Sequence, residues 1–192
     1  MAKRLESTLI NMIVSLALIS MTMSAALALV YQTTKGPIET AQKQIELNAI
    51  KLVVPEFDSD PSEGAAQKDG VFIYTLYKQN QPVGYAIKSF TEKGFSGHIE
   101  IMAGFLPDGS IHNITVLQHK ETPGLGTKMT EPAFSSQFMG KNPETFALRV
   151  KKDGGQVDAI TAATISSRAY CDAVQRAYNT LKTVNDSIPV AQ

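Results

Sequence analysis

The 192-residue sequence has no tryptophan, one cysteine and no excess of either charge sign. Because Cys171 is the only cysteine, the chain can form no internal disulfide bond, and it cannot hold an iron–sulfur cluster with several of its own thiolates. Eighteen basic and eighteen acidic residues cancel, so the overall charge favours neither a nucleic-acid partner nor a strongly charged substrate. If this protein transfers electrons, an organic cofactor must do it.

Histidine is also scarce, and its spacing does not suit a metal site. His98, His112 and His119 are scattered over strand-like segments, whereas structural metal sites group their ligands at short intervals. We therefore expect structural or solvent-facing roles for them and no bound metal. Cys171 lies beside apolar positions of a predicted helix, so we expect a small packed side chain without a redox role.

Charge is absent over one long N-terminal run. From Ser7 to Thr34 no side chain is charged, and residues Leu9 to Val30 are mostly apolar. As a helix this run is long enough to span a hydrocarbon core of roughly 30 Å. We predict a cytoplasmic tip and transmembrane anchor over residues 1–34, followed by one globular domain over residues 35–192.

A cleaved signal peptide is the alternative to a retained anchor. Lys3 and Arg4 precede the apolar run, and the small residues Ala26 and Ala28 resemble a cleavage site. The apolar region of a signal peptide usually runs about 7–15 residues, so the longer run here favours retention. The two basic residues predict a single-pass protein of the inner (cytoplasmic) membrane, with its domain on the periplasmic or extracytoplasmic side.

The rest of the chain predicts an α+β fold in which helices flank an antiparallel sheet. Pro37–Val54 is expected to be a helix with a first-turn proline, and Asp58–Gly70 a surface loop without a function. The β-rich runs and the hairpin turn between the last two are Val71–Tyr77, Val83–Ile87, Gly97–Leu106, Pro107–Ser110 and Ile111–Gln118.

Three more elements are expected after these strands. Thr130 should cap a short helix that Pro132 opens. Phe146–Val150 is expected to be a strand, and Thr164–Val184 a long helix whose apolar stripe packs on the sheet. Four aromatic side chains at helical spacing are expected in the core: Phe134, Phe138, Tyr170 and Tyr178.

A glycine-rich loop lies between a predicted strand and the short helix. Its sequence is Glu121-Thr122-Pro123-Gly124-Leu125-Gly126. Two glycines two positions apart, after a proline, make a tight loop whose backbone amides can closely approach a planar or anionic ligand. The same residues equally suit a simple reversal of the chain.

Hydroxyl side chains gather before the last predicted helix, in the segment Asp158-Ala159-Ile160-Thr161-Ala162-Ala163-Thr164-Ile165-Ser166-Ser167. Hydroxyls at a helix start usually cap its free amides, which is the interpretation that physics alone favours. The same amides, together with the positive end of the helix dipole, would also stabilise a phosphate.

Both segments resemble the FMN-binding domain family, which includes the RnfG subunit of ion-translocating ferredoxin:NAD oxidoreductase (Rnf) complexes and the NqrC subunit of sodium-pumping NADH:quinone reductases. In that family a flavin transferase recognises an Asp, two spacers, a Ser/Thr-Gly/Ala-Ala-Ser/Thr core, one further residue and a Ser/Thr. The matching residues here are Asp158, Thr161, Ala162, Ala163, Thr164 and Ser166, with Ile165 as the spacer. The commoner core begins Ser-Gly, where this chain has Thr-Ala. The resemblance implies that FMN is esterified through its phosphate to the Thr164 hydroxyl.

The glycine-rich loop is equally typical of the family, where it lies against the flavin. The residues that the resemblance implies for flavin contact are Glu121, Thr122, Gly124, Leu125, Gly126 and Lys128. Among them, the glycines and the leucine would offer amides and an apolar face, and the threonine a hydrogen bond. The glutamate or the lysine would adjust the flavin potential. The resemblance covers nearly the whole chain, from the apolar run to the last helix.

The resemblance implies an electron-transfer subunit that is not catalytic alone. It would be one station of a relay from reduced ferredoxin to NAD, coupled to sodium or proton export. Its expected partners are the other membrane and peripheral subunits of an Rnf-type complex, a flavin transferase for maturation and the lipid bilayer, with no nucleic acid. The RnfG type is favoured over the NqrC type because NqrC-like chains tend to be longer.

Two other functions fit parts of the sequence. A terminal reductase for a small extracellular substrate would keep the FMN, but it would need a second catalytic domain or a substrate pocket with acid groups. A membrane-tethered binding module would carry no cofactor, and Thr164 would then be a helix cap.

Overall fold

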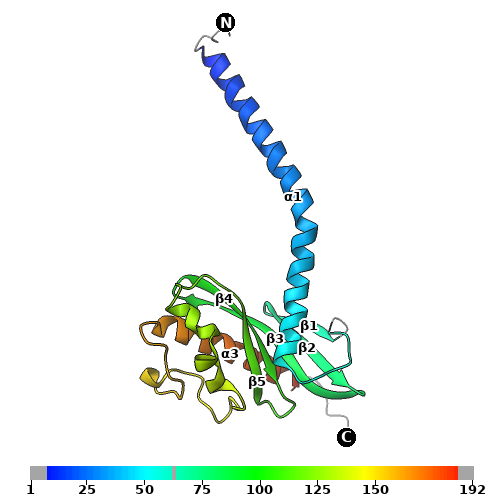
Figure 1. Ribbon diagram of the computed structural model, residues 1–192, viewed down its shortest axis with the longest axis vertical. Helices are drawn as coiled ribbons and strands as arrows, with labels where there is room; N and C mark the ends of the chain where they lie inside the picture. Colours follow the sequence, from blue (N-terminus) through cyan, green and yellow to red (C-terminus); the bar gives the residue numbers. More distant parts are fainter. Residues whose placement is uncertain (1–7, 62–63, 186–192) are drawn as a thin grey trace. The chain divides into compact units, whose positions relative to one another are not determined.

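The computed structural model describes residues 8–61 and 64–185. The chain divides into two compact units, Met1–Gln44 and Ile45–Gln192. Helix α1 (Leu9–Val53) is continuous and supplies both the first unit and the first residues of the second (Figure 1).

Helix α1 carries the apolar run and is long and apolar enough to cross a membrane. Pro37 lies inside this helix, so the expectation that a separate helix begins there is wrong. A proline removes one backbone hydrogen bond, and the preceding Thr33 and Thr34 hydroxyls donate to carbonyls one turn back, a contact that tends to bend a helix. Lys3 and Arg4, on which the expected topology depends, lie outside the described residues.

The second unit is built on an antiparallel sheet with the strand order β1-β2-β3-β4-β5. Its strands within the described residues are β1 (Ala65–Lys68), β2 (Val71–Lys78), β3 (Gln81–Gly94), β4 (Gly97–Phe105) and β5 (Ile111–His119). Each strand pairs with the next along the chain, which confirms the predicted α+β class. The turn between β4 and β5 is also confirmed, because Leu106 N–H donates to the Ser110 carbonyl at 2.8 Å.

Two predictions about the strands need correction. The segment Asp58–Gly70, expected to be a loop, contains β1, whose four residues are all exposed. Since β1 buries no side chain, it has no apolar alternation to reveal it, and it is held by backbone pairing with β2 at the sheet edge. Strand β3 extends to Gly94, well beyond the predicted end at Ile87.

Both faces of the sheet are covered. Helix α3 (Thr164–Asn185) packs on one face, where Ile73 and Ile87 point inward (Figure 1). The end of α1 packs on the other face, where Ile50 and Val53 meet alternate strand residues such as Met102. The last turns of α1 are therefore part of the core of the second unit.

Close packing between α1 and the sheet requires glycine in the strands. A Cβ atom added at Gly104 of β4 would lie 1.7 Å from the Val53 carbonyl oxygen, and one at Gly84 of β3 would lie 2.8 Å from Val54 Cγ1. Both glycines thus let the helix end approach the sheet backbone.

The remaining short elements are η1 (Gly126–Thr130), α2 (Pro132–Ser135), η2 (Ser136–Phe138) and η3 (Lys151–Asp153). Pro132 opens α2 as predicted, but the residue before the helix is Glu131. The predicted cap at Thr130 is wrong, because its hydroxyl donates to the Thr127 carbonyl at 2.9 Å.

The predicted strand Phe146–Val150 is also wrong. Only Val150 forms an isolated parallel bridge, with Val157. The Ala147 N–H instead donates to the side chain of Gln156 at 2.9 Å, so local contacts satisfy this segment in place of a ladder.

The predicted core aromatics are confirmed. Phe134 and Tyr170 pack edge to face with ring centroids 5.2 Å apart, and Phe138 and Tyr178 are buried beside them in the same core. Cys171 is 2% exposed, and burial raises the pKa of its thiol to about 12. The burial confirms the predicted packed cysteine.

Gly104→Ala should destabilise the protein by about 3 kcal/mol or more, because the new methyl group would overlap the Val53 carbonyl. Urea unfolding of the full chain in detergent, followed by circular dichroism, would measure this. The control is Gly36→Ala, since nothing lies within 4 Å of an added Cβ there. Equal stability of the two variants would show that α1 does not approach β4 this closely.

Candidate functional site

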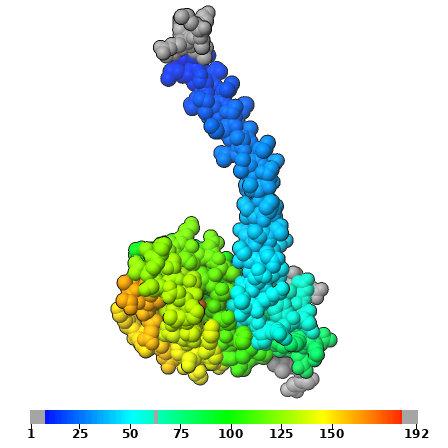
Figure 2. All heavy atoms as spheres, viewed as in Figure 1, coloured from blue at the N-terminus to red at the C-terminus, as the bar shows by residue number. Residues whose placement is uncertain are grey.

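Three segments that are distant in the sequence meet at one open cavity of about 280 Å³. They are the β3–β4 turn, the glycine-rich loop after β5 and the first turn of α3 with the residues before it. The lining residues are Phe95, Glu121, Thr122, Leu125, Gly126, Ala162, Ala163, Thr164, Ile165 and Ser166. In Figure 2, orange surface from around the start of α3 borders green surface from the strands and loops before it. The structure therefore brings the two sequence motifs together.

The Glu121 carboxylate joins the three segments. Its side chain is buried, with the residue 5% exposed. Oε1 accepts a hydrogen bond from Ser96 N–H in the β3–β4 turn at 2.9 Å, and Oε2 accepts one from the Ser166 hydroxyl on α3 at 2.5 Å. Since both oxygens have protein donors, Glu121 holds the walls of the cavity in place.

The glycines around this carboxylate leave room for it. A Cβ atom added at Gly126 would lie 2.5 Å from Glu121 Oε2, and one added at Gly94 would lie 2.7 Å from Oε1. Gly124 serves a different purpose: its φ is +74° and its N–H donates to the Thr127 hydroxyl at 3.0 Å. It shapes the turn, and it does not line the cavity.

The segment before α3 is held by Ser167 of that helix. The Ser167 hydroxyl accepts from Ile160 N–H and donates to the Ala163 carbonyl, each at 3.0 Å. Ala162 has a φ of +62°, a left-handed conformation that costs an alanine more than a glycine. This explains physically why a glycine suits the second position of the core motif.

Thr164 is the first residue of α3, lines the cavity and is half-buried. Within the described chain, its hydroxyl makes no hydrogen bond, unlike those of Ser166 and Ser167. The interpretation of Thr164 as a helix cap is therefore wrong. The backbone N–H groups of the first helical turn lie beside this hydroxyl, where a negative group is stabilised.

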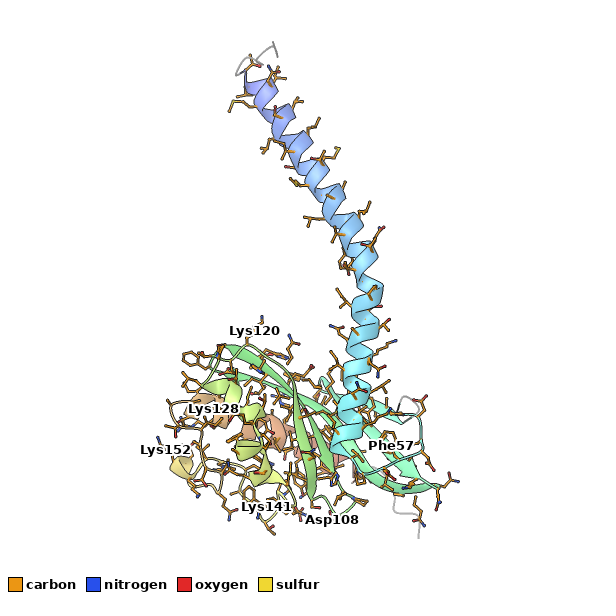
Figure 3. All side chains as sticks on the ribbon, viewed as in Figure 1. Phe57, Asp108, Lys120, Lys128, Lys141 and Lys152 are labelled. Carbon is orange, nitrogen blue, oxygen red and sulfur yellow. The ribbon has the colours of Figure 1, made fainter. Side chains whose placement is uncertain are left out.

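Besides Gly124, three predicted site residues do not line this cavity. Lys128, Asp158 and Thr161 line a separate cavity of about 270 Å³ (Lys128 is labelled in Figure 3). The Asp158 carboxylate pairs with Lys151 Nζ at 2.7 Å, and its side chain is 67% exposed. These side chains are accessible on the surface, and they do not line the cavity beside Thr164.

Phe95 is the lining residue that sequence reasoning missed. Among the described residues outside α1, the exposed large apolar side chains are Tyr77, Phe95, Leu125, Met139 and Ile165. Three of these five line this one cavity, which makes its rim strongly apolar. The available signal was the run Gly94-Phe95-Ser96-Gly97, in which an aromatic residue occupies a turn that polar residues usually fill.

No group of three or more potential metal ligands occurs among His, Cys, Asp and Glu in the described residues. His98 instead contacts Glu92 through Nδ1 at 2.7 Å and stacks on Phe90. His119 Nδ1 accepts the Glu121 backbone N–H at 3.3 Å. Both histidines thus have structural partners.

Comparison with known proteins matches this region to one family. The model of the FMN-binding domain family matches residues 94–179, a range that contains Phe95, the glycine-rich loop and the start of α3. The chain is 36% identical over 174 residues to the G subunit of the ion-translocating oxidoreductase complex of Methanosarcina acetivorans, covering 87% of this chain and 91% of that protein. It is 33% identical over 189 residues to the protein of the same name from Aliivibrio fischeri strain ES114, covering 90% of each.

Two solved structures are similar in fold. NqrC of Shewanella oneidensis is 19% identical, with 69% of this chain and 73% of that chain covered and a TM-score of 0.44. The C subunit of the Na⁺-translocating NADH-quinone reductase of Parabacteroides distasonis is 22% identical, with 67% and 75% covered and a TM-score of 0.46.

Ser166→Ala should lower the free energy of unfolding by about 1–3 kcal/mol, because it leaves one oxygen of the buried Glu121 carboxylate without its donor. Urea unfolding of protein produced without cofactor would measure the change. Ser135→Ala is the control: its hydroxyl bonds the Glu131 carbonyl at an exposed site, so a change within about 0.5 kcal/mol is expected. Equal changes in the free energy of unfolding of the two variants would mean that the hydrogen bond from Ser166 to Glu121 stabilises the fold no more than an exposed one.

Proposed function

The chain belongs to the FMN-binding domain family represented by the G subunits of ion-translocating oxidoreductase complexes, and from this we propose that it carries FMN on Thr164 as an electron-transfer subunit of an Rnf-type complex. The protein is a redox subunit of a membrane translocase and is not catalytic alone. Ferredoxin is the proposed source of electrons for the complex and NAD their acceptor.

The hydroxyl of Thr164 carries the proposal. It is half-buried at the cavity that both motifs line, and no hydrogen bond within the described chain occupies it. Small neighbours, Ala162 and Ala163, leave space around it. A phosphoester at this atom would place the phosphate against the N-terminal turn of α3, where free amides and the helix dipole favour an anion.

The cavity also fits the flavin ring in part. Its volume of about 280 Å³ lies just under the usual range for sites that enclose a whole small molecule. The site would therefore hold one portion of FMN and leave the rest at the surface. Leu125, Ile165 and Phe95 offer an apolar rim for the planar ring, and Thr122 offers a hydroxyl. Such partial exposure suits a carrier whose cofactor must come close to others.

When bound, FMN supplies the electron-transfer chemistry. The chain retains and orients it: Thr164 prevents its loss, and the loop held by Glu121 presents the apolar rim. Because both Glu121 oxygens already accept hydrogen bonds from Ser96 and Ser166, we assign Glu121 to positioning of the loop. Lys128 lines the neighbouring cavity, so any effect of its charge on the flavin potential would act over a longer distance.

The exposed Asp158 and Thr161 fit a role in maturation. A flavin transferase must read its motif from outside, and both side chains are accessible on the surface rather than turned into the cavity. We propose that they are recognised by the transferase and that Thr164 receives the FMN.

Helix α1 and the relatives make this a membrane protein. We propose that residues 1–34 are a retained anchor of the cytoplasmic membrane and that residues 35–192 form a domain on its periplasmic or extracytoplasmic side, from the charge pattern around the apolar run. The other subunits of the complex would be its partners.

The alternatives differ in what they require of the site. An NqrC-type role would use the same Thr164 attachment. The matches to the G subunits from Methanosarcina and Aliivibrio, however, cover most of this chain and most of those proteins. A terminal reductase would need acid groups around a substrate, whereas the one carboxylate that lines this cavity, that of Glu121, is occupied by protein donors. A cofactor-free module leaves the apolar rim unexplained.

Thr164→Ala should abolish covalent flavin without unfolding the domain. Intact-mass measurement of the denatured protein, produced together with a flavin transferase, should give an increase of about 438 Da for the wild type and none for the variant. Thr164→Ser should keep the adduct because it keeps the hydroxyl, and Thr161→Val tests the other motif threonine.

An adduct that persists in the Thr164→Ala variant would refute this attachment site. A wild-type chain that stays unmodified beside an active transferase would support the cofactor-free module instead.

Phe95→Trp should quench the emission of the bound flavin, because an indole in contact with the ring transfers an electron to its excited state. The native chain has no tryptophan, so its emission is the reference. Met139→Trp is the matched control, since Met139 is exposed but does not line the cavity. Equal emission lifetimes of the two tryptophan variants would show that the flavin ring does not lie against Phe95.

A further inference from the structure

Arg168 lies one helical turn beyond Thr164 on α3. With 3.6 residues per turn, the two positions differ by about 40° around the helix axis, and Arg168 projects between Thr164 and Ile165. Helical side chains lean toward the N-terminus of their helix, which for Arg168 is the direction of Thr164. Ile165 lines both the cavity beside Thr164 and the adjoining cavity of about 540 Å³ that Arg168 lines, so the two cavities are neighbours.

The guanidinium of Arg168 is oriented by an aspartate. Nε donates to Asp153 Oδ2 at 2.6 Å and Nη2 donates to Asp153 Oδ1 at 2.7 Å. This side-on pair uses two of the five N–H donors of an arginine and leaves both on Nη1 and one on Nη2. Both side chains are partly exposed, so the pair adds little stability. Its consequence is a fixed direction for the remaining donors.

A phosphoester at Thr164 would bring a permanent negative charge to this turn, because a phosphate esterified on both sides keeps one ionised oxygen. Arginine binds phosphate oxygens in a forked geometry that lysine cannot reproduce. We propose that Arg168 is the counter-ion of the phosphate attached to Thr164 and that Asp153 positions its guanidinium. This inference rests on the proposed attachment of FMN.

Other cations near this end of α3 are engaged differently. Lys151 pairs with Asp158 at 2.7 Å and Lys93 pairs with Asp172 at 2.6 Å. Lys152, labelled in Figure 3, belongs to the short helix η3. Arg149 lines the larger cavity but comes from the irregular segment before η3. Arg168 is the cation that α3 itself carries one turn from Thr164.

Phosphorus NMR tests the contact directly once residual phospholipid, whose headgroups are also phosphodiesters, has been exchanged for a phosphorus-free detergent, because the remaining phosphodiester signal then comes from flavinylated molecules. The reference is the same chain unfolded in guanidinium chloride. Arg168→Gln should move the folded-state resonance toward the unfolded position by more than half of the difference. Arg168→Lys, which keeps the charge without the fork, should move it less.

Asp153→Asn is the matched control, because it breaks the same ion pair but keeps the Arg168 charge. If Arg168 is the counter-ion and Asp153 orients it, Asp153→Asn should displace the resonance less than Arg168→Gln does, because the Arg168 charge stays and only its orientation is loosened. Equal displacement by Arg168→Gln and Asp153→Asn would mean that the pair is only a structural latch, and no displacement by either would mean that Arg168 does not meet the phosphate. Both results overturn the proposal.

Loss of the adduct in a variant and absence of covalent attachment in the wild type can be told apart from these results. If Arg168→Gln accumulates no adduct, Arg168→Lys is used in its place, and a resonance at the wild-type position in that variant overturns the proposal. A wild type that shows only a phosphate monoester, whose resonance titrates near pH 6, would refute the covalent attachment itself and this inference with it.

Discussion

The buried carboxylate of Glu121 is the interaction on which the site depends. A carboxylate that is buried without hydrogen-bond donors lowers the free energy of unfolding by roughly several kcal/mol. The two donors here come from different segments, Ser96 in the β3–β4 turn and Ser166 on α3. The requirement for space around its oxygens explains Gly94 and Gly126. The cavity beside Thr164 lies between the segments that this one side chain joins.

The sheet supplies rigid supports for those segments. Antiparallel connections place the β3–β4 turn and the end of β5 at the same end of the sheet, and α3 packs on the sheet so that its first turn reaches that end. The opposite face is closed by the last turns of α1, through close approach of Val53 to Gly104. A site held by packed elements on its several sides can keep a cofactor oriented while leaving part of it exposed.

Some elements could be predicted and others could not, for identifiable reasons. Helix α3 buries one face against the core, so its apolar periodicity marks it. Strands β2 and β4 are covered on both faces and are marked by runs of apolar and β-branched residues. Strand β1 buries nothing and is recognisable only from its pairing. Pro37 marks a helix start by local preference, yet the helix passes through it. Thr164 was named from a family pattern, whereas its free hydroxyl became visible only in three dimensions.

The sequence by itself determined the apolar span, the α+β class and the two motifs, because these depend on residue types at short spacing along the chain, whereas the choice of Thr164 came from the resemblance to a family. Only the tertiary structure decided that the motifs line one cavity, that Glu121 joins them, that Phe95 completes the rim and that Asp158 and Lys128 lie outside it. The physical reason is that these relations join residues far apart in the chain. Packing and hydrogen-bond satisfaction across the whole fold set their distances, and no local pattern records them.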